Sequence, residues 1–426
     1  MTRAGRINLV LLLLLAVPAL ASAQRDSRYT REAEKFVGLA MTRSTDAERA
    51  TQYQEALKHL REGMEKDANN AKVWLLAGTV LSNLGEAREA DTAFKKAVEL
   101  HADYAEEVRH ERHAAWAELF NAGVGAMDAQ QYDEAIRLME NAQVLFQERP
   151  EALMNLGLLY ANKNDLAKAE QAFRDAEQAT SSPLFATLEA EEQASWLRFR
   201  DMAKVSVSQM SLSRGVNAFQ EEKFDEAFAE FAKAIEVNPH SRDAIFNQAQ
   251  ALWAHAGSLE TALEAMPEGS AERPATQEKI LKLYGDAEAI AKRTLEIDPN
   301  NDALYAIIIN ASRVRGEFAT DEAVKQTHRE AALAVLEAQD RLEVLLDEIA
   351  VVPGAEESTI QGTVKNMKLA PGAQVKIRFV LLGLDGSQVG EQEVTATVGA
   401  VEESTSFESK VVPSGEVAGW KYSIVK

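Results

Sequence analysis

Two patterns of hydrophobic and polar positions divide the chain. From about residue 30 to residue 350 the apolar residues follow a helical spacing, which predicts amphipathic helices. After Pro353 and Gly354 apolar residues alternate with polar ones, as in Val375, Ile377 and Phe379, and this alternation predicts strands. The pattern therefore predicts a long helical part at 24–352 and a small β domain at 353–426.

The helical part repeats at an interval of 34 residues. Small residues recur at this interval in four places: Gly123 to Gly157, Ala135 to Ala169, Ala56 to Ala90, and Gly215 to Ala249. Other intervals are longer: 45 residues separate Gly78 from Gly123, and 58 separate Gly157 from Gly215. Such a period indicates stacked copies of one supersecondary unit, interrupted by insertions of 11 and 24 residues.

Each copy combines small residues, where two helices approach closely, with large residues that fill the remaining space. The copies contain Trp74, Gly78, Leu81, Gly85, Ala90, Phe94 and Ala97; Ala122, Gly123, Tyr132, Ala135 and Ala142; Leu153, Leu156, Gly157, Tyr160, Ala169, Phe173 and Ala176; Gly215, Phe224, Ala227, Phe231, Ala234 and Pro239. In these residues the chain resembles the tetratricopeptide repeat family over roughly residues 30–350. The resemblance implies a mainly α fold, a right-handed superhelix of antiparallel helix pairs.

Several segments depart from the regular repeat. We expect insertions near 181–207 and 256–276, the first mostly helical and the second containing a loop at Met266–Ser270 and Arg273-Pro274. Asn and Asp turns, such as Asp298-Pro299-Asn300-Asn301, should close second helices. From Asp321 to Val351 the apolar residues predict a long helix that caps the array.

The β domain should form a small antiparallel sandwich. We expect strands near 358–365, 374–384, 388–398, 404–411 and 416–425, with a hairpin turn at Asp385-Gly386. The order of its turn and aromatic residues loosely resembles immunoglobulin-like modules of exported bacterial proteins. There is no Cys pair, so a disulfide-linked immunoglobulin domain is excluded.

The N-terminus has the features of a secretory signal peptide. Arg3 and Arg6 precede an almost wholly apolar stretch, and Ala21-Ser22-Ala23 fits the small-residue cleavage pattern. We expect cleavage between Ala23 and Gln24, which removes residues 1–23 and gives a periplasmic or secreted protein. The apolar stretch is too short to span a bilayer of about 30 Å, and no later segment is long enough, so the mature chain should have no transmembrane segment.

Charge and composition exclude several classes of function. The formal charge is −21, and removal of the signal peptide makes it −23. This acidity argues against nucleic acid as a partner, because phosphate would be repelled. With no Cys, thiolate metal sites, iron–sulfur clusters, disulfides and a Cys nucleophile are excluded.

The sequence contains no recognisable catalytic motif. Phosphate-binding Gly-rich loops, Gly-x-Ser-x-Gly and His-Glu-x-x-His are absent, so we expect no enzyme, no catalytic residues and no cofactor. His110 and His113, with Glu106 and Glu107 one turn earlier, have a spacing that could hold a metal. Arg109 and Arg112 lie among them, so a charged solvent face is the favoured interpretation, and no metal site is predicted.

The resemblance implies a concave groove lined by positions 5, 9 and 12 of each first helix. Those positions are mainly apolar here, unlike the Lys and Asn with which some family members grip a terminal carboxylate. We expect partner contacts from Phe120, Met154, Leu158, Leu212, Phe219, Phe246 and Trp253. The alternative is that inserted helices or a neighbouring coil of the superhelix fill the groove.

The predicted function is a non-enzymatic protein–protein interaction scaffold in the bacterial cell envelope, with other proteins or peptides as partners. One alternative is a periplasmic carrier or chaperone-like binder of exported polypeptides. Another is a glycan-binding or enzymatic site on the β domain around Trp420 and Tyr422, although strand or core positions are the simpler interpretation of these aromatics. The sequence assigns neither the partner nor an oligomeric state.

Overall fold

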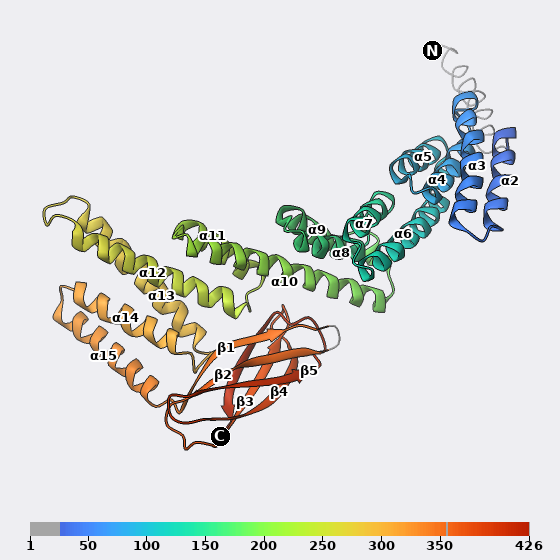
Figure 1. The fold of residues 1–426 in the computed structure, drawn as a ribbon. Helices are drawn as coiled ribbons and strands as arrows, with labels where there is room; N and C mark the ends of the chain where they lie inside the picture. Colours follow the sequence, from blue (N-terminus) through green and yellow to red (C-terminus); the bar gives the residue numbers. More distant parts are fainter. Residues whose placement is uncertain (1–25, 355–356, 426) are drawn as a thin grey trace, which may run out of the picture. The chain divides into compact units, whose positions relative to one another are not determined.

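The computed structural model describes residues 26–354 and 357–425, and the chain divides into two compact units, at 1–188 and at 189–426. The predicted signal peptide lies outside the described residues. Figure 1 shows a helical part followed by two small β-sheets. Within the described ranges, no helix combines the length and apolar character needed to cross a membrane. The mainly α fold class is confirmed.

The described residues of the first unit form four antiparallel helix pairs. They are α2 (Arg28–Met41) with α3 (Asp46–Lys66), α4 (Ala71–Asn83) with α5 (Ala87–Leu100), α6 (Ala105–Asp128) with α7 (Tyr132–Leu145), and α8 (Pro150–Asn162) with α9 (Leu166–Ala179). A short 3₁₀ turn at Ala102–Tyr104 lies between α5 and α6, and another at Phe185–Thr187 follows α9.

A glycine in the first helix lies against a large residue of the second helix, 16 positions later, in each of four repeats. A Cβ on Gly78 would lie 2.5 Å from the Phe94 ring, and one on Gly215 would lie 2.6 Å from Phe231. A Cβ on Gly157 would lie closer still to the Phe173 ring, and one on Gly123 would lie 2.8 Å from Met139. These contacts confirm the four repeat copies, because only glycine allows the two backbones to approach so closely.

The turn between the paired helices is also conserved in geometry from repeat to repeat. Its residue with positive φ is Gly85 (78°), Gln130 (59°), Asn164 (61°) and Glu222 (59°), each seven positions after the close-packed glycine. The next amide donates to the carbonyl five residues earlier, as from Glu86 to Leu81. This is the hydrogen bond that ends a helix in a Schellman motif.

The insertions lengthen helices more than they add loops. In the first unit, the 11 extra residues extend α6 to 24 residues. In the second unit, α10 (Ala190–Gln220) has 31 residues and includes most of the expected 181–207 insertion as helix. The 256–276 insertion extends α12 (Arg242–Ala265) and α13 (Arg273–Thr294), and the loop between them is limited to 266–272 because Pro274 lies in the first turn of α13.

The second unit also contains α11 (Phe224–Val237), α14 (Asp302–Phe318), α15 (Glu322–Asp340) and the β domain. Two three-stranded antiparallel sheets have the orders β1-β2-β5 and β4-β3-β6. The strands are β1 (Val344–Val352), β2 (Ser358–Asn366), β3 (Gln374–Leu382), β4 (Gln388–Thr397), β5 (Ser404–Val411) and β6 (Gly419–Val425). Side chains of both sheets, among them Leu346, Ile360 and Phe379, form one core, so the domain is a sandwich.

The predicted capping helix at 321–351 was wrong in its last third. Helix α15 ends at Asp340, and Val344–Val352 forms β1, a sixth strand that pairs with β2. A bulge between Asp347 and Ala350, with Glu348 at φ 52°, breaks the alternation of buried positions. The apolar residues of this segment therefore have a spacing in the sequence that is typical of a helix. The β domain begins earlier than residue 353.

Candidate functional site

Three predicted contact residues belong to the first unit, and they differ in exposure. Leu158 on α8 is 47% exposed, whereas Met154, one turn earlier, is 2% exposed. The prediction that Met154 contacts a partner is therefore corrected: its side chain belongs to the core. Buried residues lie nearly all round α8, which is typical of a helix packed on several sides.

Phe120 is half-buried in an aromatic column on α6. Its ring stacks on Trp116 with 5.0 Å between centroids, and His113 stacks on Trp116 at 5.9 Å. The Arg149 guanidinium lies 5.0 Å from the centre of the same indole. Phe120 thus takes part in an intramolecular stack and offers a partner only part of its ring.

The two histidines with metal-like spacing have different neighbours. His110 Nε2 lies 3.2 Å from Glu106 Oε1, and the ring of His113, which is also exposed, contacts Trp116, Phe146 and Arg149. Within residues 26–354 and 357–425, no three His, Asp or Glu side chains gather in a way that could hold a metal ion.

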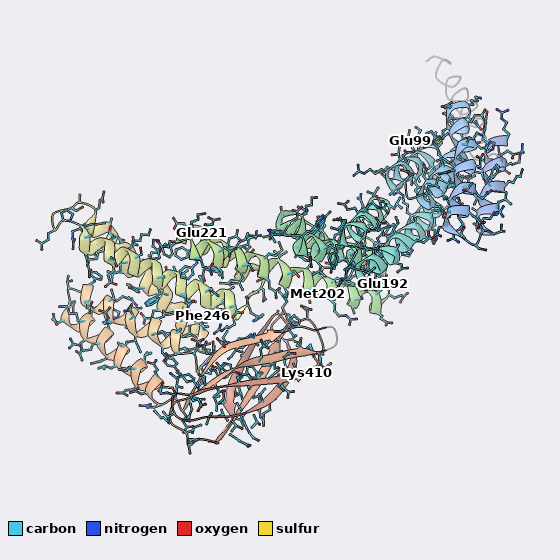
Figure 2. All side chains as sticks on the ribbon, viewed as in Figure 1. Glu99, Glu192, Met202, Glu221, Phe246 and Lys410 are labelled. Atoms are coloured by element: carbon cyan, nitrogen blue, oxygen red, sulfur yellow. The ribbon has the colours of Figure 1, made fainter. Side chains whose placement is uncertain are left out.

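In the second unit, Leu212 and Phe219 on α10 are half-buried and pack against the cluster around Phe231. Phe246, labelled on α12 in Figure 2, is half-buried as well. The Arg242 guanidinium lies 4.6 Å from the centre of its ring. These three side chains therefore contribute to packing and show limited surface to solvent.

Trp253 is the exposed aromatic of this set. Its side chain is 38% exposed, and its indole Nε1 donates to Asn310 Oδ1 at 3.0 Å. Asn310 lies on α14, nine residues after the N-cap Asn301, and Trp253 lies on α12. The hydrogen bond satisfies the indole N–H and orients the ring at the surface. Asn310 is not among the residues predicted from the sequence to contact a partner. Counted from the N-cap Asn301, it is position 9 of its helix, one of the positions expected to line the groove.

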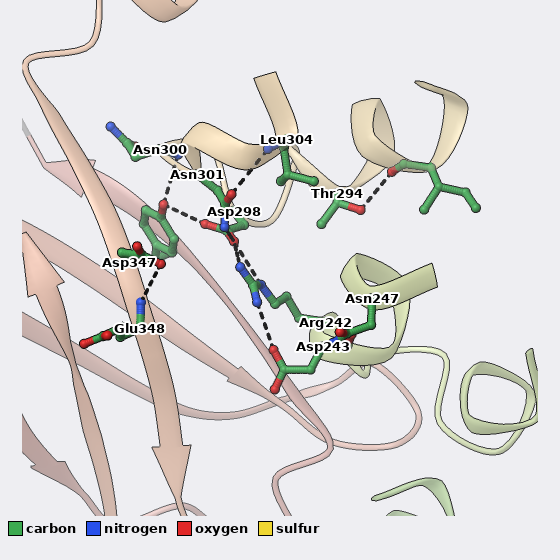
Figure 3. A network of polar contacts seen from close by, with 12 residues as sticks. Arg242, Asp243, Asn247, Thr294, Asp298, Asn300, Asn301, Leu304, Asp347 and Glu348 are labelled. Carbon is green, nitrogen blue, oxygen red and sulfur yellow. Dashed lines mark hydrogen bonds and ion pairs between the residues drawn. The ribbon is translucent and has the colours of Figure 1, made fainter. Parts of the chain in front are cut away.

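A buried polar network joins the last helical turns to the β-sandwich (Figure 3). Asp298 has no exposed surface and accepts hydrogen bonds from Arg242 Nε, Tyr422 Oη and Asn301 Nδ2, each at 2.9 Å. Burial lowers the pKa of Arg242, but the negative charges of Asp298 and Asp243 outweigh burial and hold this pKa above its usual value, so the side chain remains a cation. Burial and the negative charge of Asp298 raise the pKa of Tyr422, so its hydroxyl remains a donor.

The turn at 297–300 continues the hydrogen bonding of both sheets. The Ile297 carbonyl accepts from the Tyr422 amide of β6 at 3.2 Å, and the Asn300 carbonyl accepts from the Leu346 amide of β1 at 3.0 Å. Edge strands leave such groups unpaired. The turn therefore satisfies one amide on an edge strand of each sheet and attaches the sandwich to the helices α13 and α14.

The two aromatics considered for glycan binding belong to this junction and to the sandwich core. Trp420 is 6% exposed and Tyr422 is 4% exposed, and both rings pack near Phe379. Neither ring is available to stack on a sugar, so the alternative of a glycan site at these residues is wrong.

The comparison with protein families identifies the helical repeats. Profiles described as "Tetratricopeptide repeat" match residues 71–104, 120–183 and 212–268. The helical part of the chain is a tetratricopeptide repeat array. Its arrangement of paired helices and close-packed glycines agrees with this assignment.

Curated relatives of the array match over short stretches. Superkiller complex protein 3 of Homo sapiens is 36% identical over 69 residues, and the mouse protein from Mus musculus is 36% identical over 66 residues. Each match covers 16% of this chain and 4% of the relative. The chain thus spans a small fraction of the length of these relatives.

Solved structures are similar to this chain at low sequence identity. YrrB, described as a TPR protein with an unusual peptide-binding site, is 19% identical, with 55% of this chain and 93% of YrrB covered at a TM-score of 0.21. PilF of Pseudomonas aeruginosa is 16% identical, with 59% and 100% covered at a TM-score of 0.20.

Proposed function

We propose that this protein is a non-enzymatic scaffold of the bacterial cell envelope that binds polypeptide segments on the first-helix faces of its repeats. Tetratricopeptide arrays mediate protein and peptide binding. The observation that carries the proposal is the exposure of Leu158 and Trp253 on first helices of this array.

Trp253 has the properties of an interface anchor. Its apolar ring is partly exposed, while Asn310 satisfies the indole N–H and limits the number of side-chain conformations. Large aromatic side chains with little conformational entropy to lose contribute much of the energy of protein interfaces. The chain's charge of −21 favours basic partner surfaces through long-range attraction.

The envelope location rests on residues 1–23. Their charged start, apolar stretch and Ala21-Ser22-Ala23 fit a cleaved signal peptide. Mass spectrometry of the protein purified from its native cells, together with fractionation, tests this part. We expect a mature chain that begins at Gln24 in the envelope fraction; an intact Met1 in the cytoplasmic fraction would contradict it.

We also propose that the sandwich is immunoglobulin-like. The strand order β1-β2-β5 opposite β4-β3-β6 supports this, since it follows strands A-B-E opposite C′-C-F of such sandwiches when β1 is taken as strand A. The edge bonds to residues 297–300 then make the sandwich a part of the scaffold rather than a separate module.

Affinity capture from envelope extract tests the scaffold function. The bait is the mature chain, compared with Leu158→Ser, Trp253→Ser and the control Leu333→Ser, whose leucine is 52% exposed on α15. One dominant partner that the first two variants lose, with unchanged melting temperatures, supports the proposal. Equal capture by all chains contradicts it, and many heterogeneous clients favour a carrier of exported polypeptides.

A further inference from the structure

A cleft of about 870 Å³ opens in the first unit between the second helices α7 and α9. Leu153, Leu156 and Tyr160 of α8 form its floor, and Val144 and Ala172 contribute apolar surface to its walls. None of the predicted groove residues lines it. The cleft is therefore a different surface from the first-helix face.

One repeat earlier, α5 and α7 contact each other, and the inserted residues of α6 pack against both helices. Val108 from this extension is 5% exposed and packs in the cluster that contains Phe94 and Leu145. Arg112 donates to Asp91 Oδ1 of α5 at 2.7 Å and to the Leu145 carbonyl at the end of α7 at 2.8 Å. A helical segment with an apolar residue and an arginine thus packs across two successive second helices.

Helix α8 has no such extension. It begins at Pro150, and only residues 146–149 separate it from α7. Helices α5 and α7 pack on each other, whereas α7 and α9 do not pack closely. The cleft is the counterpart, one repeat later, of the surface that the α6 extension covers.

We propose that this cleft binds an amphipathic helix of a partner protein, which packs against α7 and α9 as the α6 extension packs against α5 and α7. The partner's apolar stripe covers Leu153, Leu156 and Ala172. This site does not depend on Leu158 or Trp253.

The charged residues that line the cleft favour one position for a basic residue of the bound helix. At one end Glu140 accepts from the Tyr160 hydroxyl, and Lys168 lies 5.1 Å from the centre of the Tyr160 ring. Glu148 and Asp175 also line the cleft, near the C-terminal ends of α7 and α9. Carboxylates and helix C-termini both favour a cation, so an arginine there would take the role that Arg112 has beside Asp91. Arg88 also lines the cleft and disfavours a second cation near itself.

Fluorescence polarisation with a labelled helical peptide tests the proposal. The probe is alanine-rich, with leucines spaced i, i+4, i+7 and one arginine on the same face, and the control peptide has the same composition in scrambled order. We expect a Kd on the order of 100 µM for the probe with the mature chain and binding about tenfold weaker or more for the scrambled peptide.

Exposed residues of the rim allow the cleft to be blocked without a change in the core. Gln147→Trp and Gln178→Trp should weaken binding of the probe about tenfold, whereas Gln54→Trp, on exposed surface of α3, should not. Asp175→Lys should weaken it about threefold through loss of the charge pair. Thermal melting checks that each variant folds.

Two results would overturn the inference: equal affinity for both peptides, or no effect of the rim substitutions in folded variants. Binding that survives Gln147→Trp but is lost in Leu158→Ser would place the peptide on the first-helix face, which removes the cleft proposal and leaves the proposed function intact. Loss of envelope-partner capture in Leu158→Ser, with normal binding of the probe, would support two separate sites.

Discussion

The Tyr422 hydroxyl donates to the Asp298 carboxylate at 2.9 Å and accepts from the Asn300 amide at 2.9 Å, although Tyr422 and Asp298 are 124 residues apart in the sequence. This contact joins a strand of the sandwich to the turn between α13 and α14. Since Asp298 is fully buried, its charge depends on such donors for compensation.

Tyr422→Phe should therefore destabilise the protein by about 1.5–3 kcal/mol, because a hydrogen bond to a buried charge is lost and the Asn300 amide loses its acceptor. Denaturant unfolding of the mature chain measures the change. The matched control is Tyr132→Phe at an exposed tyrosine, for which a change below about 0.5 kcal/mol is expected. Equal effects of the two substitutions would show that the junction contributes no stability.

The close-packed glycines predict a second set of effects. Gly215→Ala should destabilise by about 1–3 kcal/mol, because a Cβ would lie 2.6 Å from the Phe231 ring. Gly125→Ala on α6 is the control, since its Cβ would meet nothing within 4 Å and alanine favours the helix. Thermal unfolding compares the two, and a tolerated Gly215→Ala would contradict the close approach of α10 and α11.

The turn residues with positive φ predict a gain in stability. Glu222 has φ 59°, a conformation that disfavours residues with a Cβ, so Glu222→Gly should stabilise by about 0.5–1 kcal/mol. Asn164→Gly should have a smaller effect, because asparagine tolerates a positive φ better than glutamate does. If Glu222→Gly destabilised the chain more than Asn164→Gly, the account of these turns would be wrong.

The surroundings of His255 predict that the stability of the protein depends on pH. It stacks on Phe224 at 4.4 Å and also faces Phe228, and its Nδ1 has no hydrogen-bond partner among the described residues. Burial lowers the pKa of His255 below 6.5, and Lys279 lowers it further, while Asp225 acts in the opposite direction. Glu222 and Glu226 line the same pocket.

Because the folded state takes up this proton less readily than the unfolded state, the stabilisation is complete above a pH of about 6.5 and declines as the pH falls toward the lower pKa of the folded protein. His255→Phe should therefore reduce the loss of melting temperature between pH 7.5 and 5.5, whereas His110→Phe, at an exposed histidine, should not. The same acid sensitivity in all three chains would exclude His255 as its source.

Local spacing predicted the repeats well because their contacts join residues at fixed short intervals, such as Gly78 and Phe94. The strand β1 was not predicted because the bulge at Glu348 breaks its alternation of apolar and polar residues. The burial of Met154 was not predicted because its exposure depends on the neighbouring helices. The junction of Asp298 with Tyr422 and the cleft between α7 and α9 depend on contacts between distant segments. No periodicity encodes such contacts, although the α6 extension, one repeat before the cleft, was visible as a longer interval.

The most direct test of the central claim is site-specific photo-crosslinking in the native cells. A photoreactive amino acid replaces Leu158 or Trp253 on the first-helix faces, or Leu333 on α15 as a control of similar exposure. The account predicts crosslinks to a polypeptide partner from positions 158 and 253 and none from position 333. Crosslinks from position 333 alone, or none from a folded chain at 158 and 253, would contradict it.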